Sequence, residues 1–199
     1  MDATALFGLT AAVLSGTFPL GQVAHIAKNR TVAGLSDTSW LLLTLTFATW
    51  LTWGTLQHDP YLTWTNAASL TGAIYVLWKI HHTTPIPAHR LAGAALCVTT
   101  AFATQKLAGT TGAIISVYTI TALIRTRQQH TTKTATDLGG ITLTPWAIST
   151  LAQTAWLAHG IGAHKPILIA HAPFAIATNI ALMTTITKRR TQLDTSPTS

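Results

Sequence analysis

The stretch "WLLLTLTFATWLTWG" covers residues 40–54, and "WAISTLAQTAWLAHG" covers residues 146–160. Each begins with Trp, has Trp again ten positions later and ends on Gly four positions after that. The two stretches are 106 positions apart, and the same step joins rarer residues around them: Gly34 and Gly140, His58 and His164, and Pro60 and Pro166. A common preference for Leu and Thr does not explain matches of Trp, Gly, His and Pro. The sequence therefore predicts an internal duplication.

The composition is that of a membrane protein. Of the 199 residues, 48% are apolar and only 9% are charged, whereas soluble domains carry about 25% charged residues. Asp and Glu together number five, which argues against a carboxylate-ligated metal site and against catalysis by paired carboxylates. We therefore expect no enzyme activity, no cofactor and no metal.

The positive charge does not indicate nucleic-acid binding. The net charge is +7, but the basic residues lie in short runs between apolar stretches and do not gather on one polar face. That distribution is typical of the loops of membrane proteins. The single Cys97 has no second cysteine with which to form a disulfide within the chain.

Seven stretches are long and apolar enough to be membrane-spanning helices, each of which needs about 20 residues. We predict an all-α membrane protein with spans at Ala3–Ala24, Thr38–Gln57, Tyr61–Ile80, Leu91–Gln105, Leu107–Ile124, Thr144–Ile161 and Pro166–Ile186. The fourth is the shortest. The spans are rich in Thr, whose hydroxyl can donate to a carbonyl of its own helix, and in small residues that allow helices to approach closely.

The charges of the loops predict the orientation. If the N-terminus lies outside, the inner segments hold most of the basic residues, namely Lys28, Arg30, Lys79, Arg90, Arg125, Arg127, Lys133, Lys188, Arg189 and Arg190. The outer segments hold only Lys106 and Lys165. Cytoplasmic loops carry the excess of Lys and Arg. We expect a plasma-membrane protein with its N-terminus outside and its C-terminus in the cytoplasm.

The duplicated unit has three spans. We predict a first three-helix repeat at residues 1–80, a linker helix at 81–106, a second three-helix repeat at 107–190, and a disordered cytoplasmic tail at 191–199. The linker helix turns the second unit so that the two repeats, two three-helix bundles, are parallel. Parallel repeats place a substrate site at their interface, near the middle of the membrane.

Two stretches of the first unit are recognisable: "FPLGQVAHIAKNRTVAGLSDTSWLLL" at 18–43 and "DPYLTWTNAASLTGAIYVLWKI" at 59–80. Together with the 3+1+3 order of spans, they resemble the SWEET sugar transporters of the MtN3/PQ-loop superfamily. The resemblance extends from Ala3 to about Lys188. It implies seven helices and the transport of a sugar by alternating access, with no covalent step.

The chain also departs from this family. SWEET transporters have a proline in each of spans one, two, five and six, and here only Pro19 and Pro145 are present. Ser39 and Arg125 occupy the equivalent repeat positions. The Pro–Gln motif of the superfamily is spaced here as "PLGQ".

Trp50 and Trp156 are the first candidates for a binding site. Trp50 lies ten residues after Trp40, about 15 Å deeper at 1.5 Å per residue, and so near the middle of an apolar layer about 30 Å thick. Two indole rings related by the repeat can sandwich a sugar ring, and the resemblance implies the same place for them. The alternative is packing within the core.

Asn66 is the second candidate, because its amide offers donors and acceptors to a hydroxyl-rich ligand and is costly in a span unless it is paired. It matches the pocket Asn of the third span in the resembling family. Its repeat partner is Ala172, where that family implies another Asn, so we expect the adjacent His171 to contribute instead. Asn179, two turns further along, is a weaker candidate. The alternative for each is a structural hydrogen bond.

Smaller polar groups complete the predicted site. Further substrate contacts are assigned to Ser15, Thr46, Tyr118 and Thr121, each of which can alternatively bond back to its own helix. Hinge positions are assigned to the prolines that weaken local helix bonding, Pro19, Pro145 and Pro173.

These observations predict a facilitative transporter of neutral mono- or disaccharides, since no charged residue falls in the middle of a predicted span. The expected partners are the sugar and the lipid bilayer, with no nucleic acid, and the chain can form a homo-oligomer. Two alternatives remain. One is a proton-coupled PQ-loop transporter of amino acids or other small polar solutes, with His171 as the titratable group, and the other is a receptor that does not transport.

Overall fold

The computed structural model describes residues 2–56 and 58–195, without the side chains of residues 53, 56, 110 and 113. Within these residues the regular secondary structure is all helical, and there is no strand. The helices are α1 (Ala3–Asn29), α2 (Asp37–Leu56), α3 (Pro60–Thr83), α4 (Ala88–Thr134), α5 (Thr144–Gly162) and α6 (Pro166–Thr195).

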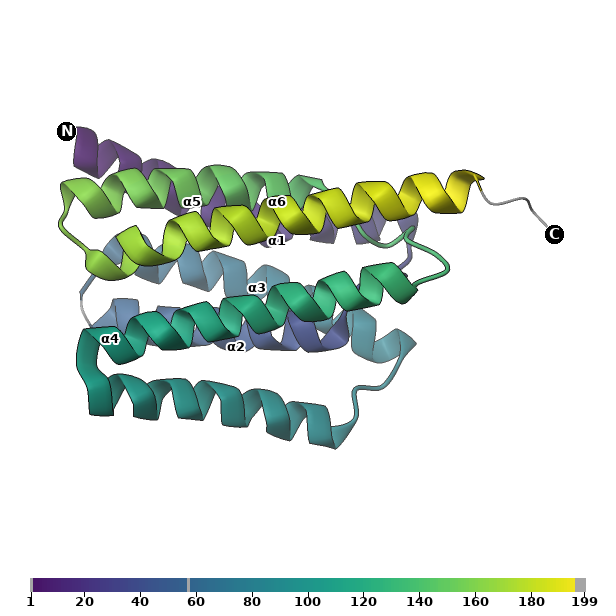
Figure 1. The fold of residues 1–199 in the computed structure, drawn as a ribbon, viewed down its shortest axis with the longest axis horizontal. Helices are drawn as coiled ribbons and strands as arrows, with labels where there is room; N and C mark the ends of the chain where they lie inside the picture. The colour runs from purple at the N-terminus through teal and green to yellow at the C-terminus, as the bar shows by residue number, and fades with distance from the viewer. Residues whose placement is uncertain (1, 57, 196–199) are drawn as a thin grey trace.

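Helix α4 is two antiparallel helices joined at a sharp turn. Gly109 has φ 56° and ψ −136°, a conformation that only glycine adopts without strain, and the chain reverses there (Figure 1). The hydroxyl of Ser116 in the second half donates to the carbonyl of Ala101 in the first half, at 3.3 Å. The described residues therefore form seven helices, in agreement with the all-α, seven-span prediction.

Successive helices run in opposite directions, so the two ends of the chain lie at opposite ends of the bundle (Figure 1). We refer to the end near residue 2 as the N-terminal end and to the end near residue 195 as the C-terminal end. By length and composition alone, three helices are apolar enough to cross a membrane: Ala3–Asn29, Ala88–Gly109 and Pro166–Thr195. The short fourth span is one of them. The protein is a seven-helix membrane protein.

Threonine lowers the hydropathy of the remaining helices without exposing a polar group. Many of its hydroxyls donate to the carbonyl four residues earlier, as the sequence led us to expect, for example in Thr44, Thr46, Thr52, Thr150 and Thr154. Bonded in this way, a hydroxyl does not need water. The Thr-rich helices are thus compatible with a lipid environment.

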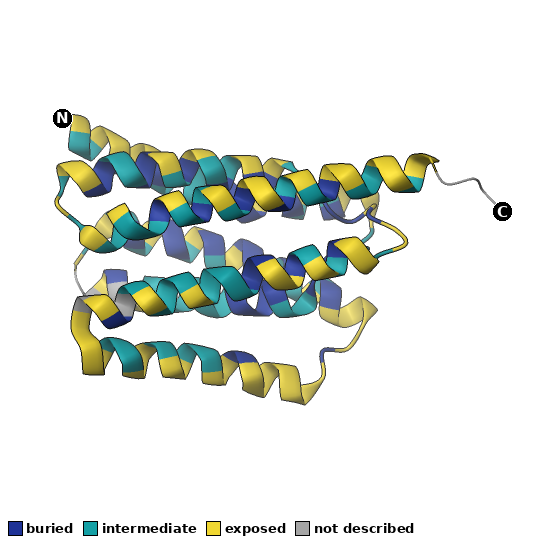
Figure 2. Cartoon of the chain, viewed as in Figure 1, coloured by how far each residue is buried: buried dark blue, intermediate teal, exposed yellow. Residues whose placement is uncertain are grey.

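The packing of the helices follows one pattern twice. In the first unit α3 packs against both α1 and α2, and in the second unit α6 packs against both α5 and the second half of α4. Across the units, α1 packs on α5 and α4 packs on α2. The first half of α4 lies at the edge of the bundle and is largely exposed (Figure 2).

The repeated Gly of the two opening stretches lies where one helix closely approaches the start of the next. A Cβ on Gly54 would lie 2.9 Å from the Cβ of Leu62, and one on Gly160 would lie 2.8 Å from the Cβ of Leu168. In both links a histidine follows with positive φ, 50° at His58 and 52° at His164. The duplicated Gly is therefore explained by a tight link that occurs twice.

Two glutamines form reciprocal bonds between the units. The amide nitrogen of Gln22 donates to the carbonyl of Gly140 at 2.6 Å, and that of Gln128 donates to the carbonyl of Gly34 at 2.8 Å. Both side chains are buried. The two donors, Gln22 and Gln128, are 106 positions apart, and so are the two acceptors, Gly34 and Gly140. The sequence analysis missed this pair, although the repeat step contained the signal.

The structure moves some of the predicted boundaries. The linker helix begins at Ala88, after two prolines, and reaches Gly109. Helix α6 continues to Thr195, so residues 191–195 are helical where a disordered tail was predicted. The rest of that tail, 196–199, and the predicted end of the second span at residue 57 lie outside the described residues.

Candidate functional site

A cavity of about 140 Å³ lies between the two three-helix units, with walls from α1, α2 and α3 on one side and from α4, α5 and α6 on the other. One water needs about 10–15 Å³ of such space, so the cavity has room for a small polar solute. Seven of the eight predicted contact residues line it: Ser15, Thr46, Trp50, Asn66, Thr121, Trp156 and His171.

The two tryptophans come from repeat-related positions on α2 and α5. The indole nitrogen of Trp156 donates to the hydroxyl of Ser15 at 2.9 Å, which ties the ring of one unit to α1 of the other. Trp156 is 6% exposed, and Trp50 also borders the cavity. Trp156 therefore lies inside the protein, and the half-buried Trp50 borders the same junction of the two units.

Asn66 is held by its own helix. Its side-chain nitrogen donates to the carbonyl of Leu62 at 2.8 Å, and the residue is 5% exposed on the cavity wall. An amide has two N–H donors and an oxygen that accepts twice. This single bond fixes the orientation of the amide and leaves most of its bonding capacity for a ligand.

His171 takes the place on α6 that its repeat position suggests. Its Nε2 lies 3.1 Å from the hydroxyl of Thr121 on α4, so two predicted site residues contact each other on the cavity wall. Asn179 lies elsewhere: its nitrogen donates to the hydroxyl of Ser149 at 3.0 Å, and it is fully buried between α6 and α5. Of the two candidates, His171 reaches the cavity.

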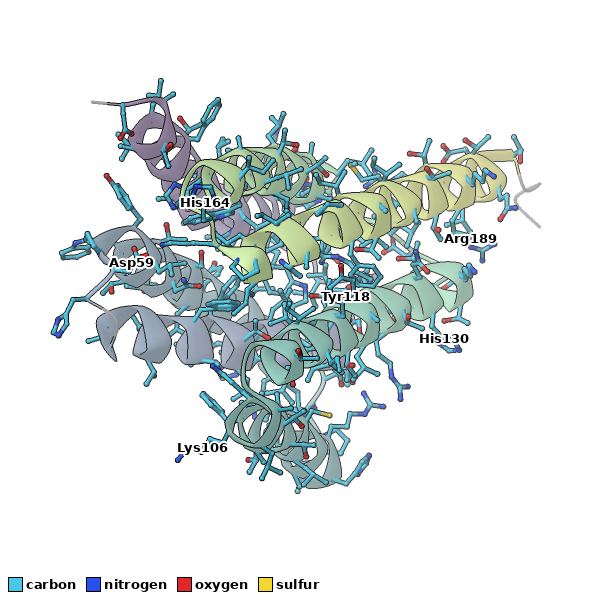
Figure 3. The ribbon with its side chains drawn as sticks, turned by 60° about the vertical axis from the view of Figure 1, so that its left-hand side comes forward. Asp59, Lys106, Tyr118, His130, His164 and Arg189 are labelled. Carbon is cyan, nitrogen blue, oxygen red and sulfur yellow. The ribbon has the colours of Figure 1, made fainter. Side chains whose placement is uncertain are left out.

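Tyr118 is the predicted contact that the structure places outside the cavity. Its hydroxyl donates to the carbonyl of Ala170, and its ring lies 4.6 Å from that of Phe174. Figure 3 shows it between the ribbons of α4 and α6. Tyr118 therefore joins α4 to α6 outside the cavity. Thr121, three residues on, contacts α6 at His171 on the cavity wall.

The three predicted hinge prolines differ in their positions. Pro19 and Pro173 lie inside α1 and α6, where a missing N–H weakens the helix. A Cβ on Gly72 would lie 2.7 Å from the Cβ of Pro19, so α3 packs closely on this point. Pro145 instead lies in the first turn of α5, where no N–H partner is needed. Pro145 therefore removes no bond from the interior of α5, and its role as a hinge stays a prediction.

The expectation that no charged residue lies within a span is also wrong. Arg125, which was counted as a loop residue, lies inside α4, 7% exposed and on the cavity wall. Its guanidinium carbon is 4.5 Å from the centre of the Trp146 ring. The sequence analysis missed this residue because the fifth span extends to Thr134, beyond the end of its apolar stretch.

Aromatic rings lie at the C-terminal end of the cavity. The ring centres of Phe18 and Trp40 are 6.4 Å apart with 15° between their planes, and those of Phe18 and Trp146 are 5.5 Å apart, edge to face. Trp40 and Trp146 are almost completely buried. With Phe18 on the cavity wall, this three-ring cluster and the glutamine pair connect the units below the cavity.

An ion pair connects the units at the N-terminal end. The ammonium of Lys165 lies 3.1 Å from a carboxylate oxygen of Asp59, and the two residues are 106 positions apart. Figure 3 shows Asp59 at the same end of the bundle as His164. Contacts between the two units thus lie at both ends of the cavity.

A second cavity of about 100 Å³ adjoins the first and shares Trp50 and His171 with it. Its outer wall includes Phe102 and Gln105, from the first half of α4. The sequence analysis assigned no role to these residues. Among the described residues there is no group of three or more His, Cys, Asp or Glu side chains that could hold a metal ion.

The comparison with family models agrees with the residues quoted above. Residues 5–84 match the MtN3 family model described as a sugar efflux transporter for intercellular exchange. No curated protein matches the chain. The matched segment is the first three-helix unit, which carries Ser15, Trp50 and Asn66 of the cavity wall. The SWEET resemblance is thus confirmed over this segment, which is similar to the sugar efflux transporters of the MtN3 family.

Proposed function

We propose that the protein is a facilitative transporter, a uniporter, of neutral mono- or disaccharides that works by alternating access. The observation that carries the proposal is the cavity between the two units, with Trp50 and Trp156 on its walls. The match of residues 5–84 to a sugar efflux transporter family supports the same class of substrate.

The residues on the cavity wall suit a sugar. The indole rings of Trp50 and Trp156 offer apolar faces to the C–H groups of a sugar ring, and Asn66 and His171 offer hydrogen bonds to its hydroxyls. Binding and release complete the cycle, and no bond of the sugar is broken.

Alternating access requires the two ends of the cavity to open in turn. At the C-terminal end, release requires the glutamine pair to part and the rings of Phe18, Trp40 and Trp146 to separate. At the N-terminal end, the ion pair of Asp59 and Lys165 must break, and so must the hydrogen bond between His159 and the carbonyl of Thr4. A rocking motion of one unit against the other separates one set of contacts while it keeps the other.

The basic residues support an orientation within this proposal. Helix ends and loops at the C-terminal end of the bundle carry Lys28, Arg30, Lys188, Arg189 and Arg190, and cytoplasmic loops are the basic ones. Even without Arg125 in the count, we place this end in the cytoplasm and the N-terminus outside, in the plasma membrane.

The test is counterflow of radiolabelled glucose and sucrose in proteoliposomes of the purified protein. We expect a labelled sugar to accumulate transiently against its unlabelled form, and Asn66→Ala to slow this exchange. Thr71→Ala is the control, because Thr71 is an exposed residue of the same helix whose hydroxyl bonds its own backbone. If no neutral sugar exchanges, the proposal is wrong. If sugar binds without flux, the protein is a receptor.

A proton-coupled transporter is the second candidate, and one observation favours it: the imidazole of His171 lies on the cavity wall, in contact with Thr121. In that case His171→Asn removes the pH dependence of uptake and leaves exchange at equal pH intact. Wild-type uptake that an imposed pH gradient does not drive excludes this candidate.

A further inference from the structure

Arg125 is a buried cation for which the described residues supply no anionic partner. Its Nε and Nη1 are fully buried and have no hydrogen-bond acceptor in the described part of the chain. The contact that the guanidinium makes is with the face of the Trp146 ring. A charge inside a membrane protein is costly, and such residues are therefore paired with each other or mark the path of a substrate.

The five Asp carboxylates of the chain are bonded to other groups or lie outside the buried core. Asp37 pairs with Arg90 and Asp59 pairs with Lys165. The other three carboxylates lie outside the buried core. Asp2 caps α1, and Asp137 accepts a hydrogen bond from a loop amide. Asp194 lies near the exposed end of α6. The chain has no Glu. No carboxylate of the described residues neutralises Arg125, so an anion from outside the chain can take that place.

The side chain of Arg125 lies at the edge of the proposed solute site, with its Nε and Nη1 buried. It borders the same cavity as Asn66 and Trp156, and Trp146 covers part of it on the side of the three-ring cluster. The repeat counterpart of Arg125 is Pro19, which packs against Gly72. The cation therefore lies on only one side of the junction, and the cavity has a charged side and a neutral side.

We propose that Arg125 makes this cavity a binding site for sugar acids, with the carboxylate of the solute on the guanidinium and its ring between Trp50 and Trp156. Arginine is suited to this role because its guanidinium stays charged and donates charge-assisted hydrogen bonds to a carboxylate. Asn66, on the neutral side, takes the hydroxyls of the ring. The inference rests on the proposed function, transport of a sugar through this cavity, and extends the substrates from neutral sugars to sugar acids.

Glucuronate and glucuronamide form the matched pair of probes, because they differ by one charged group and have nearly the same shape. In counterflow of labelled glucose, we expect glucuronate to inhibit at a concentration about tenfold lower than glucuronamide. Arg125→Gln should abolish that difference, and Arg125→Lys should keep part of it. Arg127→Gln, an exposed arginine on the same helix, is the control and should change nothing.

Equal inhibition by the two probes in the wild-type protein overturns the inference, and so does a preference that survives Arg125→Gln. The wild-type comparison needs no variant, so it remains decisive if Arg125→Gln fails to fold. The assay is run in methanesulfonate and in chloride. If the two probes are equal in methanesulfonate and glucose exchange requires chloride, the cation binds an inorganic anion and the inference is wrong.

The failure of this inference is distinct from failure of the proposed function. Exchange of glucose without discrimination between the probes overturns only the role of Arg125. Flux of labelled glucuronate without any flux of glucose overturns the neutral substrate and supports the sugar-acid site.

Discussion

The two crossings between the units, α1 on α5 and α4 on α2, are related by the 106-residue step but differ in chemistry. The α1–α5 crossing packs the ring of Pro145 on Gly21, where an added Cβ would lie 3.5 Å from it. At the corresponding point of the other crossing, the hydroxyl of Ser39 donates to the carbonyl of Ile124 at 2.8 Å. Arg125, the buried cation, is the next residue after Ile124.

The comparison separates what the repeat conserves from what it changes. The conserved part is backbone geometry: the tight links after Gly54 and Gly160 and the reciprocal bonds of Gln22 and Gln128. The changed part is the side chains at the crossings, where one crossing has a proline and the other a buried cation that borders the cavity. A duplicated scaffold thus holds a site whose two sides can contact different parts of one solute.

The largest effect on stability is expected at Gly140, in the loop before α5. A Cβ on Gly140 would lie 2.4 Å from the backbone nitrogen of Ala33 and the backbone carbon of Val32, and backbone atoms cannot move aside. Gly140→Ala should cost about 3 kcal/mol or more of stability, measured by thermal unfolding in detergent. Gly93→Ala is the control, because no atom lies within 4 Å of its added Cβ. Equal melting temperatures for both variants would contradict the close approach of the two loops.

The glutamine pair gives the next largest effect. Gln22→Ala and Gln128→Ala each leave a buried carbonyl without its donor, at a cost of about 1–3 kcal/mol. Gln128→Ala should cost more, since its side chain also accepts from the amide of Ser36 at 3.0 Å. The adjacent Gln129→Ala is the control, because that side chain is only partly buried. If all three variants unfold alike, the reciprocal bonds do not hold the crossings together.

Replacing the buried cation should have a smaller effect of the opposite sign. Arg125→Met keeps much of the side-chain volume and removes a charge that is costly to bury, so we expect unchanged stability or a gain of about 1 kcal/mol. Arg127→Met, on the exposed side of the helix, should change little. Clear destabilisation by Arg125→Met alone would mean that the contact with Trp146 stabilises the fold.

The ion pair at the N-terminal end should contribute least to stability. The side chains of Lys165 and Asp59 are 39% and 16% exposed, and pairs in contact with water are worth about 1 kcal/mol or less. Asp59→Asn should therefore leave the melting temperature almost unchanged but increase labelling of a Cys placed at Ser15, after Cys97 is replaced. The reversed pair, Asp59→Lys with Lys165→Asp, should restore the wild-type labelling rate. Unchanged labelling in Asp59→Asn would show that the pair does not close this end.

The sequence predicted the features that depend on pattern. Apolar length located the seven helices, and the 106-residue step placed Trp50 and Trp156 on facing helices. The same step predicted that Asn66 and His171 lie at one site, and both border the cavity. The match of unusual residues at one fixed step was sufficient because a repeated sequence folds into a repeated backbone.

The rest depended on helix rotation and on the exact ends of helices, which residue patterns do not fix. Tyr118 and Thr121 are three positions apart on one helix, yet only Thr121 faces the cavity. Arg125 was assigned to a loop because the apolar stretch ends there, whereas the helix continues to Thr134.

The most direct test of the central claim is counterflow of labelled sugar in proteoliposomes that contain Trp50→Ala, Trp156→Ala or Trp64→Ala. The account predicts that each of the first two changes slows exchange by about tenfold, because both rings border the cavity between the units. Trp64 is 76% exposed, and its replacement should leave exchange unchanged. Wild-type exchange rates in both Trp50→Ala and Trp156→Ala would contradict the account, because the sugar would then not pass between these rings.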